Sequence, residues 1–239
     1  MIDVGTAQAH LRRSVEEFQR LLSVADLAAP VPPCPSWTVD DLVRHVCGIY
    51  RWVGRALGVP GTAGAPAAGT DRGRLVDWYR TCAAELQETL RSTDPDLTVP
   101  TFDDRPGPAA FWSRRQAHET AVHLWDLGTA GGRDLGYDED LALDGIDEVV
   151  MLFFPRQVAL GRIRPLERAL ALAPVGQDRR WVLAGDGTSR TDDASTALSG
   201  PTDVLVLALW GQCGLDDPRL RVQGDPAAAA AVLTAGIVP

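Results

Sequence analysis

Residues 114–126 read RRQAHETAVHLWD, and this stretch is the strongest indicator of both fold and chemistry in the chain. It lies inside a pattern that predicts a helix from about Ala109 to Leu127, ending at the glycine-rich stretch 128–132. Apolar residues at helical spacing predict further helices on both sides. We expect them within residues 11–25, 38–58, 75–90 and 141–160, the last bent or broken by Pro155.

The spacing within this stretch decides which polar residues share a helix face. The string is close to the zinc-protease motif HExxH, but His118 and His123 are five residues apart and diverge by about 140° on a helix. Glu119 and His123, at positions i and i+4, lie one turn apart on one face. A carboxylate and an imidazole in this arrangement are able to bind one metal ion, because bundles build metal sites from Glu and His on facing helices.

A further ligand is expected from the helix that begins near residue 38. Residues 31–37 contain three prolines, which exclude a helix and predict a stiff loop. Thr38 followed by Asp41 predicts an N-cap with a capping box. His45 comes three residues after the apolar Leu42, so we expect it on or beside the buried face of this helix.

His45, Glu119 and His123 together make a His₂Glu ligand set. Three protein ligands leave one coordination position open, which is typical of catalytic rather than structural zinc. Two ordinary alternatives stand beside this hypothesis: an inward His is often a core residue bonded to a backbone carbonyl, and a Glu–His pair is often solvated. The same pattern predicts His118 next to the site and His10 on the surface.

The character of the chain changes after Pro165. Short strands, a hairpin turn and two helices are predicted there, over residues 170–173, 180–183, 185–187, 191–198, 202–212, 220–223 and from 226 onward. We therefore expect an α+β protein. Its predicted parts are a helical bundle over residues 1–162 and a small mixed α/β domain over residues 163–239.

Composition narrows the classes of partner. The 239 residues are 45% hydrophobic with a net charge of −9, and all 23 basic residues are Arg, so nucleic acid and anionic membranes are poor matches. No run of about 20 apolar residues predicts a membrane span, and the N-terminus does not resemble a signal peptide. We expect a cytoplasmic protein whose cysteines are free thiols, namely Cys34, Cys47, Cys82 and Cys213.

Two motifs resemble one known family. Residues 34–45, CPSWTVDDLVRH, resemble the entry to the second helix of the mycothiol-dependent maleylpyruvate isomerase family, and residues 118–126, HETAVHLWD, resemble its fourth-helix motif. The outline of residues 200–225 is also similar to that family. The resemblance implies a DinB-like up-and-down helical bundle with an appended α/β domain. It also implies a divalent metal, expected to be zinc, held by His45, Glu119 and His123, with mycothiol as cosubstrate.

The resemblance further implies a mechanism in which the thiol binds the metal, loses its proton and attacks a small electrophile. Arg114 and Arg115 are candidates for binding an anionic ligand, although solvent exposure is the alternative for at least one of them, and Trp52 is a candidate pocket wall. The chain departs from the family at Leu124 and Gln212, where relatives commonly carry Arg. Maleylpyruvate itself is therefore doubtful as the substrate, and we expect an S-transferase, with isomerisation as a second reaction type.

Two other functions fit the same sequence. The three ligands would equally serve a non-catalytic metal-binding or thiol-binding protein, such as a sensor of the thiol pool. Alternatively, the C-terminal domain binds a lipid or another apolar ligand while the bundle is structural. The expected partners are a small-molecule thiol and a small electrophile, with no nucleic acid and no membrane, and the chain is expected to be a monomer or a homodimer.

Overall fold

The chain divides into two compact units, which are described separately. The computed structural model describes residues 1–62, 64–102, 106–188 and 194–239. One unit spans Ile2–Gly136, and the other combines Met1 with Tyr137–Pro239. No helix in these ranges is long and apolar enough to cross a membrane.

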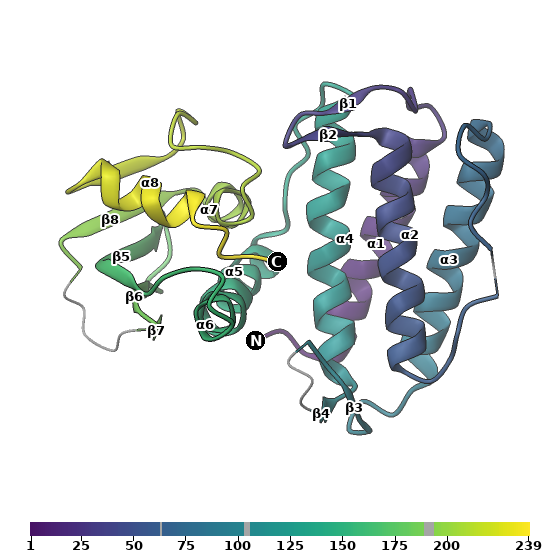
Figure 1. The fold of residues 1–239 in the computed structure, drawn as a ribbon, viewed down its shortest axis with the longest axis horizontal. Coiled ribbons are helices and arrows are strands. Elements are labelled where there is room, and N and C mark those ends of the chain that lie inside the picture. Colours follow the sequence, from purple (N-terminus) through teal and green to yellow (C-terminus); the bar gives the residue numbers. More distant parts are fainter. Residues whose placement is uncertain (63, 103–105, 189–193) are drawn as a thin grey trace. The chain divides into compact units, whose positions relative to one another are not determined.

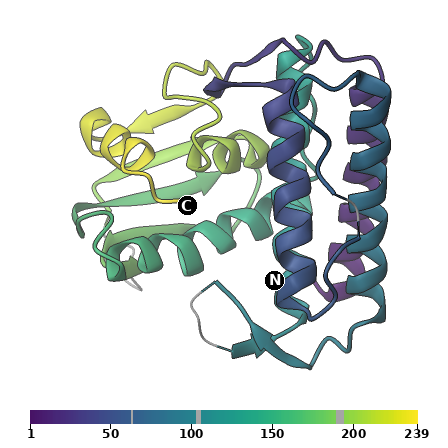
Figure 2. The same ribbon diagram turned by 45° about the vertical axis from the view of Figure 1, so that its right-hand side comes forward.

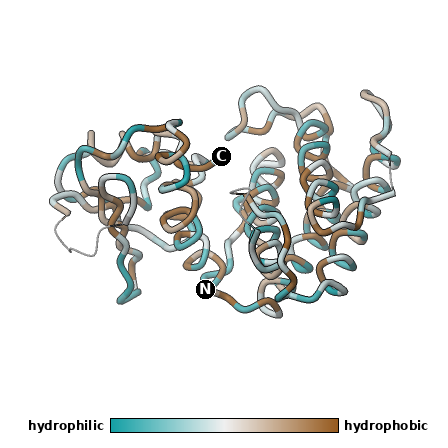
Figure 3. The backbone as a smooth tube through the Cα atoms, turned by 60° about the horizontal axis from the view of Figure 1, so that its bottom comes forward, coloured by the Kyte–Doolittle hydropathy of each residue, from teal (hydrophilic) through white to brown (hydrophobic). Residues whose placement is uncertain are grey.

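The first unit is a bundle of long helices: α1 (Val4–Leu22), α2 (Val39–Ala56), α3 (Arg72–Ser92) and α4 (Ala110–Ala130). They lie side by side (Figure 1); α1 packs on α3 and α4, and α2 packs on the same two helices. Hydrophobic and hydrophilic residues alternate along each helix (Figure 3), as expected when one face is buried. The predicted helical bundle is confirmed.

Helix α2 begins where the sequence predicts. The side chain of Thr38 accepts a hydrogen bond from the backbone N–H of Asp41 at 3.3 Å, and the Asp41 carboxylate accepts one from the backbone N–H of Thr38 at 2.9 Å. The proline-rich segment before it is not a helix, as predicted. It forms a short antiparallel ribbon of β1 (Pro30–Val31) and β2 (Cys34–Thr38) rather than a loop without strands.

A second short ribbon joins α3 to α4. Strands β3 (Thr98–Pro100) and β4 (Pro106–Pro108) pair antiparallel, at the opposite end of the bundle from β1 and β2 (Figure 1). The ribbon was not expected, because three-residue strands rich in Pro and Gly have no readable period. Residues 103–105, between the two strands in the sequence, lie outside the described residues.

The prediction for His10 was wrong. Its side chain is only 3% exposed, and its Nδ1 lies 2.7 Å from Nη2 of Arg13. His10 comes three residues after Ala7 and four before Ser14, which are both buried, so it shares their face of α1. The neighbouring Arg12 and Arg13 are exposed on the same helix, and Arg13 reaches back to the His10 ring.

The second unit opens with an interrupted helix. Helix α5 (Glu139–Glu148) continues through a π-helical turn, η1 (Val149–Phe153), into α6 (Phe154–Ala159). Pro155 has no N–H to donate to the carbonyl one turn earlier, so the α-helical ladder is interrupted at this position. The predicted interruption is present as a π-helical turn directly before Pro155, and α6 runs through Pro155 itself.

A mixed sheet of order β7-β6-β5-β8-β9 completes this unit. Its pairs are antiparallel apart from the central parallel pair of β5 and β8. Helix α7 lies in the connection from β8 to β9. Figure 2 shows α7 and the C-terminal α8 (yellow) beside this sheet, and both helices contact β5 and β8. The elements are β5 (Leu166–Pro174), β6 (Trp181–Gly185), β7 (Gly187–Thr188), β8 (Thr196–Gly200), α7 (Thr202–Leu209), β9 (Arg221–Gln223) and α8 (Pro226–Thr234).

The expected strands and helices of this unit are present, with shifted ends. The predicted hairpin turn at residues 185–187 joins β6 to β7. The strand predicted for residues 191–198 is observed as Thr196–Gly200. Residues 194 and 195 are not in the strand, and residues 189–193 lie outside the described residues. The predicted domain boundary at residue 162 differs from the structure, in which the units divide at residues 136 and 137. Helix α5 packs on α7, and α6 contacts β7, so this helical segment belongs with the sheet.

Candidate metal site

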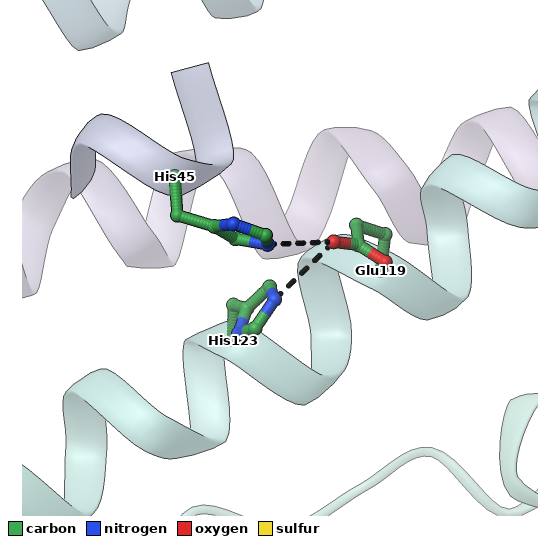
Figure 4. A group of neighbouring side chains, drawn as sticks. All are labelled: His45, Glu119 and His123. Atoms are coloured by element: carbon green, nitrogen blue, oxygen red, sulfur yellow. Dashed lines mark hydrogen bonds and ion pairs between the residues drawn. The ribbon is translucent and has the colours of Figure 1, made fainter. Parts of the chain in front are cut away.

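The predicted ligands His45, Glu119 and His123 converge on one point of the bundle. His45 lies on α2, and the other two lie one turn apart on α4 (Figure 4). Oε1 of Glu119 is 3.3 Å from Nε2 of His45 and 3.2 Å from Nε2 of His123. The ligand atoms of all three residues lie within 4.8 Å of one another.

These distances fit a divalent metal. Ligand atoms about 2.0–2.2 Å from a tetrahedral zinc lie roughly 3.3 Å apart, which matches both separations from the Glu119 oxygen. Two imidazole nitrogens and a carboxylate oxygen are also a donor set that zinc prefers. The exposed fraction of the side chain is 33% for His45 but only 12% for Glu119 and 13% for His123. The site is therefore mostly buried and reaches solvent on the side of α2.

Asp126 orients one of the imidazoles. Its Oδ2 lies 2.8 Å from Nδ1 of His123, and the Asp126 side chain is fully buried. In the neutral imidazole, a proton on Nδ1 donates to this carboxylate and leaves the lone pair of Nε2 available to a metal. Carboxylate–histidine–metal arrangements of this kind fix the tautomer and raise the basicity of the ligand. The spacing of three residues between His123 and Asp126 was a signal for this role that the sequence analysis did not use.

Arg115 holds the other oxygen of Glu119. Its Nη2 donates to Oε2 of Glu119 at 2.6 Å, one helical turn before it on α4. Burial by itself raises the pKa of Glu119, but the hydrogen bonds with His123 and His45 and the Arg115 charge outweigh it and lower the pKa well below its usual value. Glu119 is thus an anion at neutral pH, which is the form that binds a metal.

His123 is basic in the metal-free protein. Burial lowers the pKa of His123, but the hydrogen bonds to Asp126 and Glu119, with the charges of both, raise it to about 9. Without a metal, His123 is therefore protonated at neutral pH and forms an ion pair with Glu119. A metal ion replaces that proton as the positive charge between the two residues.

Trp37 and Cys34 reach the same region from strand β2. The Trp37 ring centroid is 4.8 Å from that of His45 and 6.2 Å from that of His123. Burial and the nearby Asp126 carboxylate raise the pKa of the Cys34 thiol to about 11. Cys34 is therefore protonated at neutral pH and is a poor competitor for a metal.

The other predicted residues lie elsewhere or have different partners. Arg115 is 1% exposed and faces Glu119, and Arg114 is half-buried. Trp52 lies two helical turns beyond His45 and packs on Phe102 and Trp112, with ring centroids 5.4 and 4.9 Å apart. His118 is fully buried but is not part of the ligand group among the described residues.

Comparison with known proteins agrees with this architecture. The chain is similar in structure to a crystal structure of the mycothiol-dependent maleylpyruvate isomerase, with a TM-score of 0.65 at 16% identity, and to a histidine-to-alanine mutant of that protein, with a TM-score of 0.69 at 15% identity. Each match covers 94% of this chain and 95% of the other. At these low identities the comparison shows a shared fold, and the coverage means that the shared fold includes the C-terminal α/β unit.

Sequence comparison adds relatives and a family. Two curated proteins of Mycobacterium tuberculosis, Rv0738 from strain H37Rv and MT0763 from strain CDC 1551, are each 28% identical over 149 residues. Each match covers 61% of this chain and 78% of the relative, and both relatives are described as uncharacterized. The family described as the mycothiol maleylpyruvate isomerase N-terminal domain matches residues 9–128, a range that contains all three converging ligands. The chain therefore belongs to the mycothiol maleylpyruvate isomerase N-terminal domain family.

Proposed function

We propose that this protein is a mycothiol-dependent metalloenzyme that activates the thiol for attack on a small electrophilic substrate. One observation carries the proposal. His45, Glu119 and His123 point at one another with metal-ligand spacing, inside the segment that matches the mycothiol maleylpyruvate isomerase family. The names of the structural neighbours, both mycothiol-dependent maleylpyruvate isomerases, support a thiol as the cosubstrate.

Each residue has a defined part in this proposal. His45 and His123 offer Nε2 and Glu119 offers Oε1 to a divalent cation, which we expect to be zinc. When bound, such a cation supplies a Lewis acid that deprotonates a coordinated thiol. Asp126 keeps His123 in the tautomer that binds through Nε2. The Trp37 ring lies against the two imidazoles and forms an apolar edge of the site.

The type of reaction depends on which electrophile the thiol attacks. We propose a transferase-type reaction, in which the thiol adduct is the product, ahead of a maleylpyruvate-isomerase-type reaction. The reason is the lack of Arg at Leu124 and Gln212, together with the commitment of the buried Arg115 to Glu119 rather than to an anionic substrate. We also propose a cytoplasmic location, where the protein would meet the thiol pool, and a monomeric or homodimeric state.

The test is thiol consumption by the zinc-loaded protein. Mycothiol is mixed with chlorodinitrobenzene or a bimane, and we expect faster adduct formation with the protein than without it. The variants His45→Ala, Glu119→Ala and His123→Ala should each lose both the bound metal and the acceleration while remaining helical. Glu88→Ala, which removes an exposed carboxylate on α3, is the matched control and should change neither.

The same experiment separates the alternative function. If the wild type binds metal and mycothiol but accelerates none of a range of electrophiles, the protein is a metal-binding or thiol-binding protein without catalysis. If metal content is unchanged in all three ligand variants, the ligand assignment itself is wrong. A purified protein carrying lipid and no metal would instead favour the lipid-binding hypothesis.

A further inference from the structure

We propose that Arg115 is a positioning residue for the metal site: it retains Oε2 of Glu119, so that Glu119 offers only Oε1 to the metal. This inference rests on the proposed metal site. It assigns Arg115 a task different from binding an anionic substrate or cofactor, for which its position in the sequence made it a candidate.

The two oxygens of Glu119 face different partners. Oε1 is the atom that lies 3.3 Å from His45 and 3.2 Å from His123. Oε2 accepts from Nη2 of Arg115 at 2.6 Å, a short charge-assisted hydrogen bond. The carboxylate is thus divided, with one oxygen turned to the imidazoles and one retained by the guanidinium.

The burial of Arg115 makes this contact persistent. The side chain is 1% exposed, and a guanidinium does not lose its proton in a protein. Separating a buried ion pair costs free energy, because both charges have been removed from water. Turning Oε2 from the guanidinium to a metal would weaken this ion pair inside the bundle. The arrangement therefore opposes bidentate binding by Glu119.

The number of protein ligand atoms decides what else the metal is able to hold. With one oxygen from Glu119 the protein supplies three donors, which leaves a fourth position of a tetrahedral site for an external ligand. With both oxygens it would supply four. Arg115 thereby preserves the open position on which the proposed thiol chemistry depends, without touching the thiol or the substrate.

The experiment measures cobalt binding to the full chain without thiol or substrate. Co²⁺ replaces zinc in such sites, and its visible absorption is intense for four-coordinate sites and weak for higher coordination numbers. Arg115→Met keeps an unbranched side chain but removes the donors and the charge. We expect it to bind Co²⁺ about 10- to 100-fold more weakly, the range found for lost outer-sphere partners, and with weaker absorption per bound ion.

Two further variants control the comparison. Arg115→Lys keeps the charge and one flexible donor, so we expect it to recover part of both the affinity and the absorption. Arg91→Met removes another helical Arg–Glu pair, the exposed pair with Glu88 on α3, and should leave the spectrum unchanged. A folded Arg115→Met protein with wild-type affinity and spectrum would overturn the proposal.

A measurement on the wild type covers the case in which Arg115→Met does not fold. X-ray absorption of the zinc-loaded wild type should show one carboxylate oxygen near the metal, and two oxygens from Glu119 would overturn the proposal. The proposed function fails separately. If the wild type takes up no metal, the metal site is wrong; if metal and spectra behave as expected but no electrophile reacts, only the thiol chemistry is wrong.

Discussion

Asp126 supports the proposed site without being a ligand, through its contact with Nδ1 of His123. Asparagine at this position keeps the size of the side chain, but its neutral carbonyl is a weaker acceptor for Nδ1–H of His123 than a carboxylate. Its NH₂ group is a donor and cannot accept from Nδ1–H at all. We expect Asp126→Asn to weaken zinc binding by about 10- to 100-fold, measured by competition with a chelator. Asp77→Asn, on the exposed Asp77–Arg80 pair of α3, should have no effect. Equal affinities for the Asp126 variant and the wild type would rule out the orienting role.

The raised pKa of His123 predicts two opposite pH dependences: the stability of the metal-free protein falls with rising pH, and its zinc affinity rises. Because the folded pKa is about 9 and the ordinary value is 6.5, the ion pair stabilises the metal-free protein fully below pH 6.5. That contribution disappears as the pH rises through 9. Zinc must displace the proton, so zinc affinity should rise by about tenfold per pH unit up to about pH 9.

Both dependences are measurable on the same preparation. Thermal unfolding of the metal-free protein follows the first, and zinc titrations at several pH values follow the second. In Asp126→Asn the pKa of His123 loses one of its raising partners, so both windows should move to lower pH. A zinc affinity that is flat between pH 6.5 and 9 would show that His123 is not a ligand, or that it binds no proton there.

At the scale of elements, the Thr38–Asp41 capping box stabilises the N-terminus of α2, the helix that carries His45. Thr38→Ala removes the side-chain acceptor of the capping box and should lower the free energy of unfolding by about 1 kcal/mol. Thr81→Ala is the control, because Thr81 is exposed in the middle of α3 and its hydroxyl donates to a carbonyl of its own helix. Urea unfolding should place it within about 0.5 kcal/mol of wild type. If both variants lose the same free energy of unfolding, the capping box does not stabilise α2.

The elements also show what the sequence was able to predict. The capping box, the helix from about 109 to 127 and the break at Pro155 depend on local spacing and were predicted close to their observed places. The short ribbons β1–β2 and β3–β4 depend on pairing between segments, which a single sequence does not show. The ligand trio was a hypothesis from helical periodicity. Arg115 was a candidate for binding an anionic ligand, with solvent exposure as the alternative, because periodicity alone does not tell which neighbour a buried charge meets.

At the scale of the molecule, the boundary near residue 136 separates every group of the proposed metal site from the α/β unit. Helix α5 resembles the bundle helices in sequence, being amphipathic, and this is why the sequence predicted a boundary at residue 162. Its apolar face packs on α7 instead. The bundle unit has its own buried core, which includes Phe18, Leu42, Tyr79 and Trp112.

This separation predicts that residues 2–136 alone fold and bind the metal. The fragment contains His45, Glu119 and His123 with their supports Arg115 and Asp126, so its zinc affinity should lie within a few-fold of that of the full chain, and circular dichroism should show a helical protein. The fragment of residues 137–239 should bind none at this site. Acceleration of mycothiol conjugation by the full chain, but not by a zinc-loaded 2–136 fragment, would mean that the α/β unit contributes to thiol or electrophile binding. A folded fragment that takes up no zinc would contradict the assignment of all metal ligands to the bundle.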